Sequence, residues 1–392
     1  MHKTMRCVIH SLAFGGDGVG KIEGKVCFVE GALPGEDVSF AVTKETPKFV
    51  KGYMTKIHTS SPDRIKPECI YYEECGGCQL QHLSYEKEVY YKKEQVKELL
   101  KRLGGEIVEK DIEITPSERP YNYRTSITLH RSNLGYGFYK RDNRTILPIK
   151  KCVLADEHLN KKLPFESAGP HEKQDVTLKS DASGGVWVSG EQGNRFFKDR
   201  YRDVEITSSP NIFTQSNRCM AEKISLKLDE WMKELSMPED SVLFDLYAGN
   251  GFFSFIISTK FGMKICVDSD RAAIECAKIT VADKKLGGYK FYKSAVEENF
   301  GEVFERYKKG FNVILIDPPR QGLDKNFSAR LKEIKEAERI YYISCDPACF
   351  ARDVKILSPS EGKSGWKLNK IAVFDMFPRT SHIEILSEFV RG

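Results

Sequence analysis

The chain has 392 residues, of which 30% are charged and 40% are hydrophobic, and its formal net charge at pH 7 is +5. Even a dense apolar stretch such as residues 252–257 falls far short of the ~20 residues that span a bilayer. The first residues lack the apolar core of a signal peptide. We therefore expect a cytoplasmic protein of two or three domains whose net charge, by itself, identifies no partner.

The first 60 residues predict a small β-barrel. Runs of strand-forming residues at 6–10, 25–29, 37–42 and 53–57 are separated by turns that contain glycine. Several short strands in so short a segment are typical of a barrel of the OB type.

The remainder of the chain divides into two parts with different patterns. Up to about residue 205 the pattern is mixed, with a helix expected over 84–103 and strand-like runs at 124–129 and 186–188. Strands then alternate with helices, which is typical of a doubly wound, Rossmann-like α/β domain. The sequence thus predicts a multi-domain α/β protein with an OB-like barrel, a central α+β domain and a C-terminal α/β domain, at 1–60, 61–205 and 206–392.

Two strand ends in the C-terminal part suit a cofactor that contains a nucleoside. The buried run 241–246 is followed by Tyr247-Ala248-Gly249-Asn250-Gly251, whose glycines allow a sharp turn and close approach of a ligand. The next strand ends at Asp268, where an acid commonly binds ribose hydroxyls. The dinucleotide fingerprint would place glycine or alanine at position 254, which is serine here, so S-adenosylmethionine fits better than NAD.

Later strand ends add reactive side chains at the same edge of the predicted sheet. Asp317-Pro318-Pro319-Arg320 follows the strand at 311–316, and a carboxylate there faces the ligand crevice. Cys345 ends the strand at 339–344 and is a candidate nucleophile. Glu384 could serve as a general base that His382 orients.

These motifs together resemble the RNA (uracil-5-)-methyltransferase family. The matching pieces are Phe213-Thr214-Gln215-Ser216-Asn217, Asp245 to Gly251, Asp317-Pro318-Pro319-Arg320, Ser344-Cys345 and His382-Ile383-Glu384. The resemblance implies that Gln215, Tyr247, Asp268 and Asp317 line the S-adenosylmethionine pocket, where the turn at Gly249, Asn250 and Gly251 also belongs. It further implies that Cys345 is the nucleophile and Glu384 the base.

The chemistry explains why the family needs this pair. Uracil C5 is a poor nucleophile until a thiolate adds at C6 and concentrates electron density on C5. A free thiol is mostly protonated at neutral pH, so the site should favour the thiolate, with Arg320 or Arg352 as candidate helpers. The family often has Asn after the nucleophile, and Asp346 stands there instead. A carboxylate close to the thiol would oppose its ionisation.

Four cysteines form a separate candidate site. Cys69, Cys75 and Cys78 lie close together in the sequence and Cys152 follows at a distance, the three-plus-one form of an iron–sulfur site. Zinc usually takes two close pairs of cysteines, and only one such pair occurs here. The family resemblance implies a 4Fe-4S cluster on these ligands, so we expect that cluster rather than zinc. Methyl transfer needs no electrons, so the cluster would be structural or would position RNA.

The expected partner is RNA that presents an unpaired uridine in a loop. Between Arg119 and Lys151 there are eight Lys or Arg residues and one acid, interleaved with Tyr121, Tyr123, Tyr136, Phe138 and Tyr139. Cations neutralise phosphates and aromatic rings stack on bases, although a solvated sheet face with core aromatics gives the same pattern. The N-terminal barrel resembles the TRAM domain, an RNA-binding module. We expect a monomer that needs no protein partner.

Several other functions remain open at this level. An amino-group methyltransferase would normally place an aromatic residue where Arg320 stands, and a DNA cytosine-C5 enzyme would typically have proline before its nucleophile. An RNA-binding or folding factor with weak or lost methylation is a third alternative, favoured by Asp346. Within the family, the barrel and the cysteines favour a 23S ribosomal RNA substrate over transfer RNA.

Overall fold

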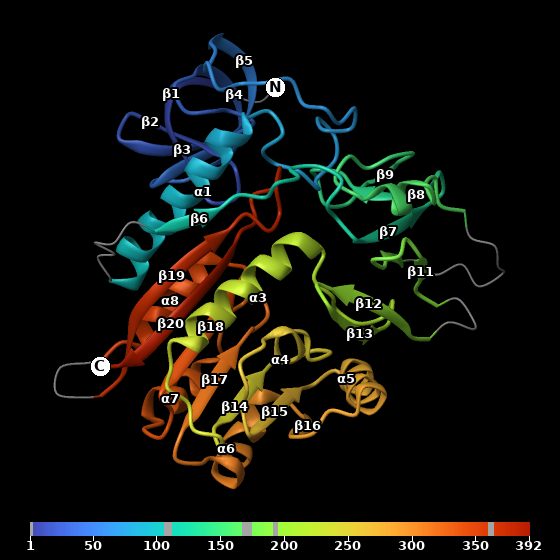
Figure 1. The fold of residues 1–392 in the computed structure, drawn as a ribbon. Helices are drawn as coiled ribbons and strands as arrows, with labels where there is room; N and C mark the ends of the chain where they lie inside the picture. Colours follow the sequence, from blue (N-terminus) through green and yellow to red (C-terminus); the bar gives the residue numbers. More distant parts are fainter. Residues whose placement is uncertain (1–2, 106–111, 167–174, 191–194, 360–363) are drawn as a thin grey trace.

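The computed structural model describes residues 3–105, 112–166, 175–190, 195–359 and 364–392. The N-terminal segment is a closed barrel in the order β1-β2-β3-β5-β4, which confirms the predicted barrel (Figure 1). Its strands are β1 Thr4–Leu12, β2 Gly18–Ile22, β3 Lys25–Glu30, β4 Asp37–Glu45 and β5 Phe49–Thr59. The barrel closes because alternate residues such as Ile9, Val29 and Phe40 point into one small apolar core.

The central part of the chain contributes a long helix and two small sheets. Helix α1 (Tyr85–Leu99) continues as the π-helical turn η1 (Leu100–Gly104), which confirms the helix predicted over 84–103. A five-stranded sheet follows in the order β11-β10-β7-β8-β9, together with the hairpin β12-β13 and the short helix α2. The bounds are β7 Ser126–Ser132, β8 Gly135–Tyr139, β9 Ile146–Pro148, α2 Glu157–Asn160, β10 Asp175–Ser180, β11 Val186–Val188, β12 Phe197–Tyr201 and β13 Val204–Ser208.

An eight-stranded sheet in the order β16-β15-β14-β17-β18-β20-β19-β6 forms the C-terminal part. The pairs from β16 to β18 are parallel, and β20 is antiparallel to both of its neighbours. The strands are β6 Glu113–Thr115, β14 Val242–Leu246, β15 Met263–Asp268, β16 Tyr289–Lys293, β17 Asn312–Ile316, β18 Arg339–Ser344, β19 Trp366–Phe374 and β20 Glu384–Arg391. This is the α/β domain that the alternation of strands and helices predicted.

Helices cover both faces of this sheet, because its central strands are apolar on both sides. Phe244 of β14 packs on the side of α1, α6, α7 and α8, whereas its neighbour Leu243 packs on the side of α3, α4 and α5. The helices are α3 Arg218–Lys233, α4 Phe252–Ile256, α5 Arg271–Lys284, α6 Val296–Tyr307, α7 Lys325–Glu333 and α8 Pro347–Leu357. In the described part of the chain, no helix combines the length and apolarity needed to cross a membrane.

Two elements from the middle of the chain complete the C-terminal layer. Strand β6 pairs in parallel with the end of β19, and Val96, Leu99 and Leu100 of α1 and η1 lie in the same core as the sheet. The sequence did not predict strand β6, which is only three residues long. Its place in the sheet depends on a partner more than 250 positions later in the chain.

A buried cluster of charged side chains holds α1 against the end of β19. Lys92 Nζ donates to Glu88 Oε1 at 2.8 Å and to Asp375 Oδ1 at 2.7 Å, and all three side chains are fully buried. Burial raises the pKa of Glu88 to about 7, although Lys92 and Arg379 act in the opposite direction. Because the one lysine neutralises two carboxylates, its loss would leave two buried acids without a full countercharge.

We therefore expect Lys92→Met to lower the free energy of unfolding by about 3–5 kcal/mol, the usual cost of removing one partner from a buried ion pair. Urea denaturation followed by circular dichroism measures this change. Lys87→Met on the same helix is the matched control, because Lys87 is 43% exposed and lies 3.7 Å from Asp63. Its loss should cost less than about 1 kcal/mol. Equal effects of the two variants would contradict the stabilising role of the buried cluster.

Candidate active site

One cavity of about 580 Å³ opens at the carboxyl ends of the central strands. Residues from the ends of β14, β15, β17 and β18 and from the start of β20 line it, together with the segment before α3. The structure brings together seven of the residues that the sequence singled out: Gln215, Tyr247, Gly249, Asp268, Asp317, Cys345 and Glu384. Because β20 runs antiparallel to β18, its first residue Glu384 reaches the same edge as Cys345.

The turn after β14 and the end of β15 form one side of this cavity. Tyr247 and Gly249 have φ values of 60° and 56°, so the backbone reverses sharply there. The amides of Gly249 and Asp270 donate to the two carboxylate oxygens of Asp268, each at 2.7 Å. Asp268 is therefore held facing the cavity, where its carboxylate suits ribose hydroxyls.

Asn250 and Gly251, which the sequence also placed at the cofactor, do not line the cavity. Asn250 Nδ2 donates to Thr207 O at 3.2 Å, away from the pocket, and Gly251 begins helix α4 with a φ of 80°. A side chain at position 251 would lie 2.6 Å from the ring of Phe255, so glycine is needed for packing. Their role in the structure is to shape the turn that presents Gly249.

The cavity lining includes residues that were missing from the predicted set, and two of them, Glu297 and Phe213, bear on the site. Glu297, in the first turn of α6, accepts a hydrogen bond from Tyr247 Oη at 2.6 Å and fixes that ring. Its position just beyond the end of β16 was the available signal. Phe213 lies at the cavity with 72% of its surface exposed, which leaves its ring free to contact a ligand.

Three groups of the cavity, Asp317, Cys345 and Glu384, have raised pKa values. Burial and the charges of Asp245 and Asp268 raise the pKa of Asp317 to about 7. Burial, followed by the charges of Glu384 and Asp317, raises the pKa of the Cys345 thiol to about 12. Burial also raises the pKa of Glu384 well above its usual range. Burial is thus the largest cause of the raised pKa at all three groups.

Arg320 is the cation that opposes these shifts. It lines the cavity and lowers the pKa of both Cys345 and Glu384. Arg352, the other candidate helper, instead donates to Gln321 O at 2.9 Å and to Asp353 Oδ1 at 2.8 Å, and it does not line the cavity. Burial and nearby cations lower the pKa of His382 to about 4, so this ring is neutral at physiological pH.

Asp346 has a structural role that the sequence did not reveal. Its Oδ1 accepts hydrogen bonds from the amides of Ala348 and Cys349 at 2.9 and 2.8 Å and so caps helix α8. Capping by aspartate is a common way to begin a helix. The carboxylates that raise the pKa of Cys345 are Glu384 and Asp317 rather than Asp346. The acid next to the nucleophile is thus no argument for lost activity.

These proton affinities predict how the reaction depends on pH. With Cys345 as the nucleophile and Glu384 as the base, as the sequence predicts, the thiolate and the carboxylate both have to form. Both pKa values are raised, so kcat/KM should then increase with pH between about 6 and 9. Arg320→Gln should shift this increase to higher pH and lower kcat/KM at pH 7 by about tenfold for each unit of pKa change. Steady-state kinetics with a fixed RNA measures the profile.

Arg352→Gln is the control for this experiment, because that arginine lies in the same region but outside the cavity. Its profile should keep the wild-type midpoint. A profile that falls with rising pH, or one that Arg320→Gln leaves in place, would contradict the assigned electrostatics.

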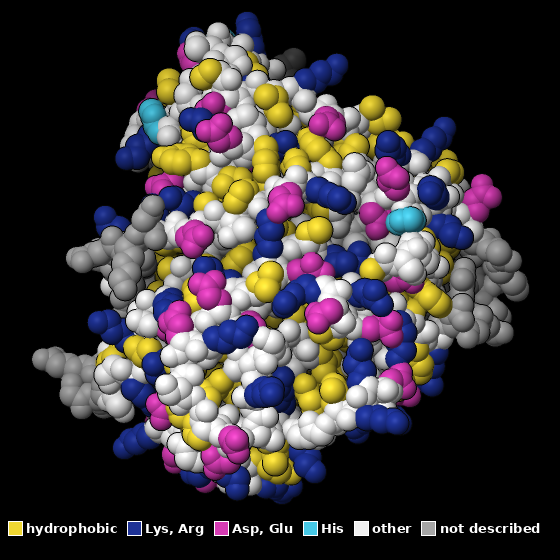
Figure 2. Space-filling view, viewed as in Figure 1, with side chains coloured by type: hydrophobic (Ala, Val, Ile, Leu, Met, Phe, Trp, Pro, Cys, Tyr) yellow, Lys and Arg dark blue, Asp and Glu magenta, His cyan; other side chains and the backbone are white. Residues whose placement is uncertain are grey.

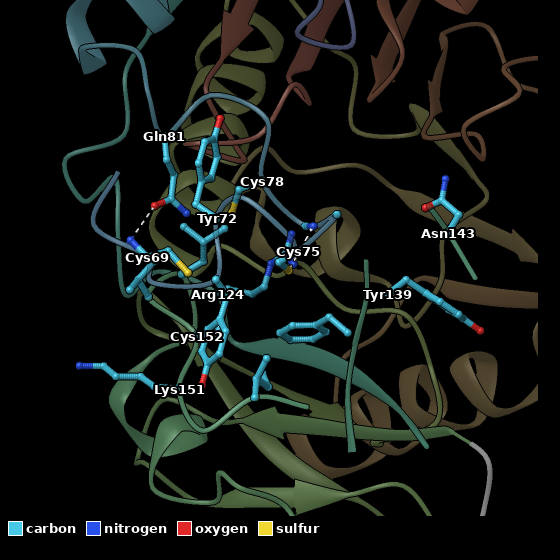
Figure 3. Close-up of a pocket in the computed structure, with 17 residues that line it drawn as sticks. Cys69, Tyr72, Cys75, Cys78, Gln81, Arg124, Tyr139, Asn143, Lys151 and Cys152 are labelled. Atoms are coloured by element: carbon cyan, nitrogen blue, oxygen red, sulfur yellow. Dashed lines mark hydrogen bonds between the residues drawn. The ribbon is translucent and has the colours of Figure 1, made fainter. Parts of the chain in front are cut away.

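The four predicted cysteine ligands surround a second cavity of about 230 Å³ (Figure 3). Cys78 is buried and the other three are half-buried, and burial raises the pKa of Cys78 to about 12. Glycine at position 76 permits this arrangement, since a side chain there would come within 3.1 Å of Lys140 O. Among the described residues, no three His, Cys, Asp or Glu side chains are arranged to hold a single metal ion.

Two hydrogen-bond donors at this cavity lack a partner. Gln81 Nε2 and Arg124 Nε are both buried, and neither makes a hydrogen bond. Buried donors are normally paired, so this cavity suits a group that brings its own acceptors. Four thiols around a volume larger than one ion, together with spare N–H groups, fit a cluster with bridging sulfides.

Fewer residues of the basic and aromatic segment 119–151 are available to contact RNA than the sequence suggested. Tyr123 and Tyr136 are buried core residues and cannot stack on a base. Lys140 and Arg141 pair with Glu74 and Glu30, whereas five cations of the segment remain exposed, namely Arg119, Arg131, Arg144, Lys150 and Lys151. Figure 2 shows lysine and arginine side chains interspersed with acids over the visible face rather than gathered in one patch.

The fold and the cavity together define an S-adenosylmethionine-dependent methyltransferase. Comparison with known protein families supports this class and makes it more specific. The family model tRNA (Uracil-5-)-methyltransferase matches residues 194–387, and the TRAM domain model matches residues 3–55. A protein from Aquifex aeolicus named as an RNA methyltransferase is 30% identical, over 98% of each chain. The chain belongs to the RNA (uracil-5-)-methyltransferase family.

Two further relatives have more specific names. The 23S rRNA (uracil(1939)-C(5))-methyltransferase RlmD of Haemophilus ducreyi is 29% identical, over 98% of this chain and 94% of that protein. The Pyrococcus abyssi tRNA (uracil-54, C5)-methyltransferase, solved in complex with S-adenosyl-L-homocysteine, is 25% identical with a TM-score of 0.74. That comparison covers 98% of this chain and 100% of the solved one.

Proposed function

We propose that this RNA uracil-5 methyltransferase modifies 23S ribosomal RNA through a covalent adduct between Cys345 and C6 of the target uridine, with Glu384 as the general base. The single observation that carries the mechanism is the shared cavity of Cys345, Glu384 and the cofactor-side residues. A nucleophile, a base and a methyl-donor site within one cavity of about 580 Å³ can act on the same ring.

In the proposed reaction, Sγ of the Cys345 thiolate bonds to C6, and the electron pair of the C5–C6 double bond moves onto O4 as an enolate. C5 then bonds to the methyl carbon that S-adenosylmethionine would supply, and the bond from that carbon to the sulfonium sulfur breaks with its electron pair left on sulfur. The carboxylate of Glu384 then takes the proton from C5. The C6–S bond breaks, the double bond re-forms and the thiolate of Cys345 leaves.

The cavity supports distinct roles for its other residues. Gln215, Tyr247, Gly249, Asp268 and Asp317 would bind the cofactor, with Asp268 at the ribose. Arg320 would favour the charged forms of Cys345 and Glu384. The target uridine must leave its stack to enter, and the exposed ring of Phe213 suits contact with an unpaired base.

The 23S substrate rests on the relatives named RlmD, which match over 96% and 98% of this chain. Transfer RNA is the second candidate. It is favoured by the Pyrococcus abyssi enzyme, whose fold covers 98% of this chain. We place ribosomal RNA first because several full-length relatives carry that name.

We also propose that Cys69, Cys75, Cys78 and Cys152 hold a 4Fe-4S cluster and that the TRAM barrel binds RNA. The cavity geometry, the spare donors of Gln81 and Arg124 and the cysteine spacing support the cluster. The three-domain division at about residues 60 and 205, a monomeric state and a cytoplasmic location remain predictions. Iron and sulfide analysis of anaerobically purified protein tests the cluster, with about four of each per chain expected.

Mapping of 5-methyluridine in RNA from cells with and without this gene tests the substrate. We expect one or more 23S uridines to lose the methyl group in the deletion strain and to regain it with purified enzyme and labelled cofactor. Loss confined to transfer RNA would select the second candidate. Label found on an exocyclic amine, or on no RNA, would contradict the proposed function.

A further inference from the structure

Residues 377–382 form one wall of the active-site cavity, which Phe377 and His382 line directly. The segment leads into Glu384, the first residue of β20. Within the described residues, the hydrogen bonds that residues 377–381 make outside the segment all go to the N-terminal half of the chain. The partners are Gln79, Leu80, Leu83, Glu88, Lys92 and Tyr123.

Gln79 joins this wall to the loop that carries Cys75 and Cys78. Its Oε1 accepts a hydrogen bond from the amide of Ser381 at 3.2 Å, and its Nε2 donates to Gly76 O at 2.8 Å. The amides of Gln79 and Leu80 also donate to Arg379 O, at 3.2 and 3.0 Å. One side chain thus spans from the cysteine loop to the residue immediately before His382.

The wall needs such external support because its backbone is not relaxed. Arg379 has a φ of 67°, a left-handed conformation that is unfavourable for a residue with a Cβ atom. Its amide donates to Glu88 Oε1 at 2.7 Å, and its guanidinium donates to Leu83 O at 2.9 Å. A conformation of this kind persists only where the surroundings hold it, and here the surroundings are the cysteine loop and α1.

We propose that Gln79 is a positioning residue of the active site, fastening the wall 377–382 to the cysteine loop and so holding His382 beside the base. The catalytic part of this inference rests on the proposed function, whereas the fastening does not. The fastening would give the cysteine cavity a structural role in a reaction that consumes no electrons. A cluster bound by Cys75 and Cys78 would order the loop that supports the wall.

Hydrogen–deuterium exchange of the full-length protein tests the fastening directly. In Gln79→Ala, the amides of the peptide covering 376–384 should exchange about tenfold faster, as expected when a restraining hydrogen bond is lost. The kcat/KM for RNA should fall by about tenfold, while affinity for S-adenosylmethionine and iron content stay at wild-type values. Retained cofactor affinity shows that the variant is folded.

Two matched variants separate positioning from general loosening. Gln79→Glu keeps an oxygen that can accept from Ser381 but loses the donor to Gly76 O, so exchange in 376–384 and kcat/KM should fall between those of wild type and Gln79→Ala. Gln95→Ala removes a buried side-chain amide that donates to the carbonyls of Leu12 and Ala13, and it should leave the wall unchanged.

The inference would be overturned if the amides of 376–384 exchanged at the wild-type rate in Gln79→Ala, or if their exchange rate rose equally in Gln95→Ala. Faster exchange with unchanged kcat/KM would also overturn it, because the wall would then not position catalytic groups. Faster exchange in an enzyme whose product lacks 5-methyluridine would support the fastening and contradict only the proposed function.

Discussion

Cys345→Ala is expected to lower methyl transfer to RNA by at least about 10³-fold while affinity for S-adenosylmethionine stays within about twofold of wild type. Without Sγ no bond to C6 forms, and C5 stays too electron-poor to accept the methyl group. The residues proposed to bind the cofactor, Gln215, Tyr247, Asp268 and Asp317, come from other segments, so their arrangement should survive. Transfer of labelled methyl and calorimetric titration of the cofactor measure the two quantities.

The matched control is Cys349→Ala. Cys349 follows Cys345 in the chain and lies in the first turn of α8. Cys349 is also half-buried but does not line the active-site cavity, so its loss should leave turnover near the wild-type rate. Turnover by Cys345→Ala at a rate similar to that of this control would rule out covalent catalysis by Cys345.

Glu384→Gln is expected to stop the reaction one step later and to accumulate a covalent protein–RNA adduct. Glutamine matches glutamate in size but cannot take the proton from C5, so the methylated adduct cannot eliminate the thiolate. Turnover should fall at least about 10²-fold, the usual contribution of a general base. The adduct should appear as a slower band on a denaturing gel and depend on both RNA and S-adenosylmethionine.

The double variant Cys345→Ala with Glu384→Gln serves as the control and should form no adduct. Glu388→Gln is a second control and should accumulate no adduct. Glu388 is buried in the same strand, but it accepts hydrogen bonds from Tyr341 and Asn369 and does not line the cavity. An inactive Glu384→Gln enzyme without any adduct would remove Glu384 from the role of base, and another group would have to accept the C5 proton.

The sequence by itself determined the barrel, the long helix at 84–103 and the parallel α/β sheet, because period-2 and period-3.6 apolar patterns are local properties of the chain. It also located most of the residues that share the active-site cavity. Parallel strands bring their carboxyl ends to one edge, so Asp268, Asp317 and Cys345 had to meet once the strands were correct.

The tertiary structure decided what depends on partners distant in the chain. Only the packed molecule shows that Asp346 caps α8, that Arg320 rather than Arg352 faces the thiol and that Glu297 holds Tyr247. Side-chain direction and long-range pairing leave no periodic signal in a sequence. For the same reason, the support that Gln79 gives to a wall about 300 residues later becomes visible only in the folded chain, where hydrogen bonds join the two segments.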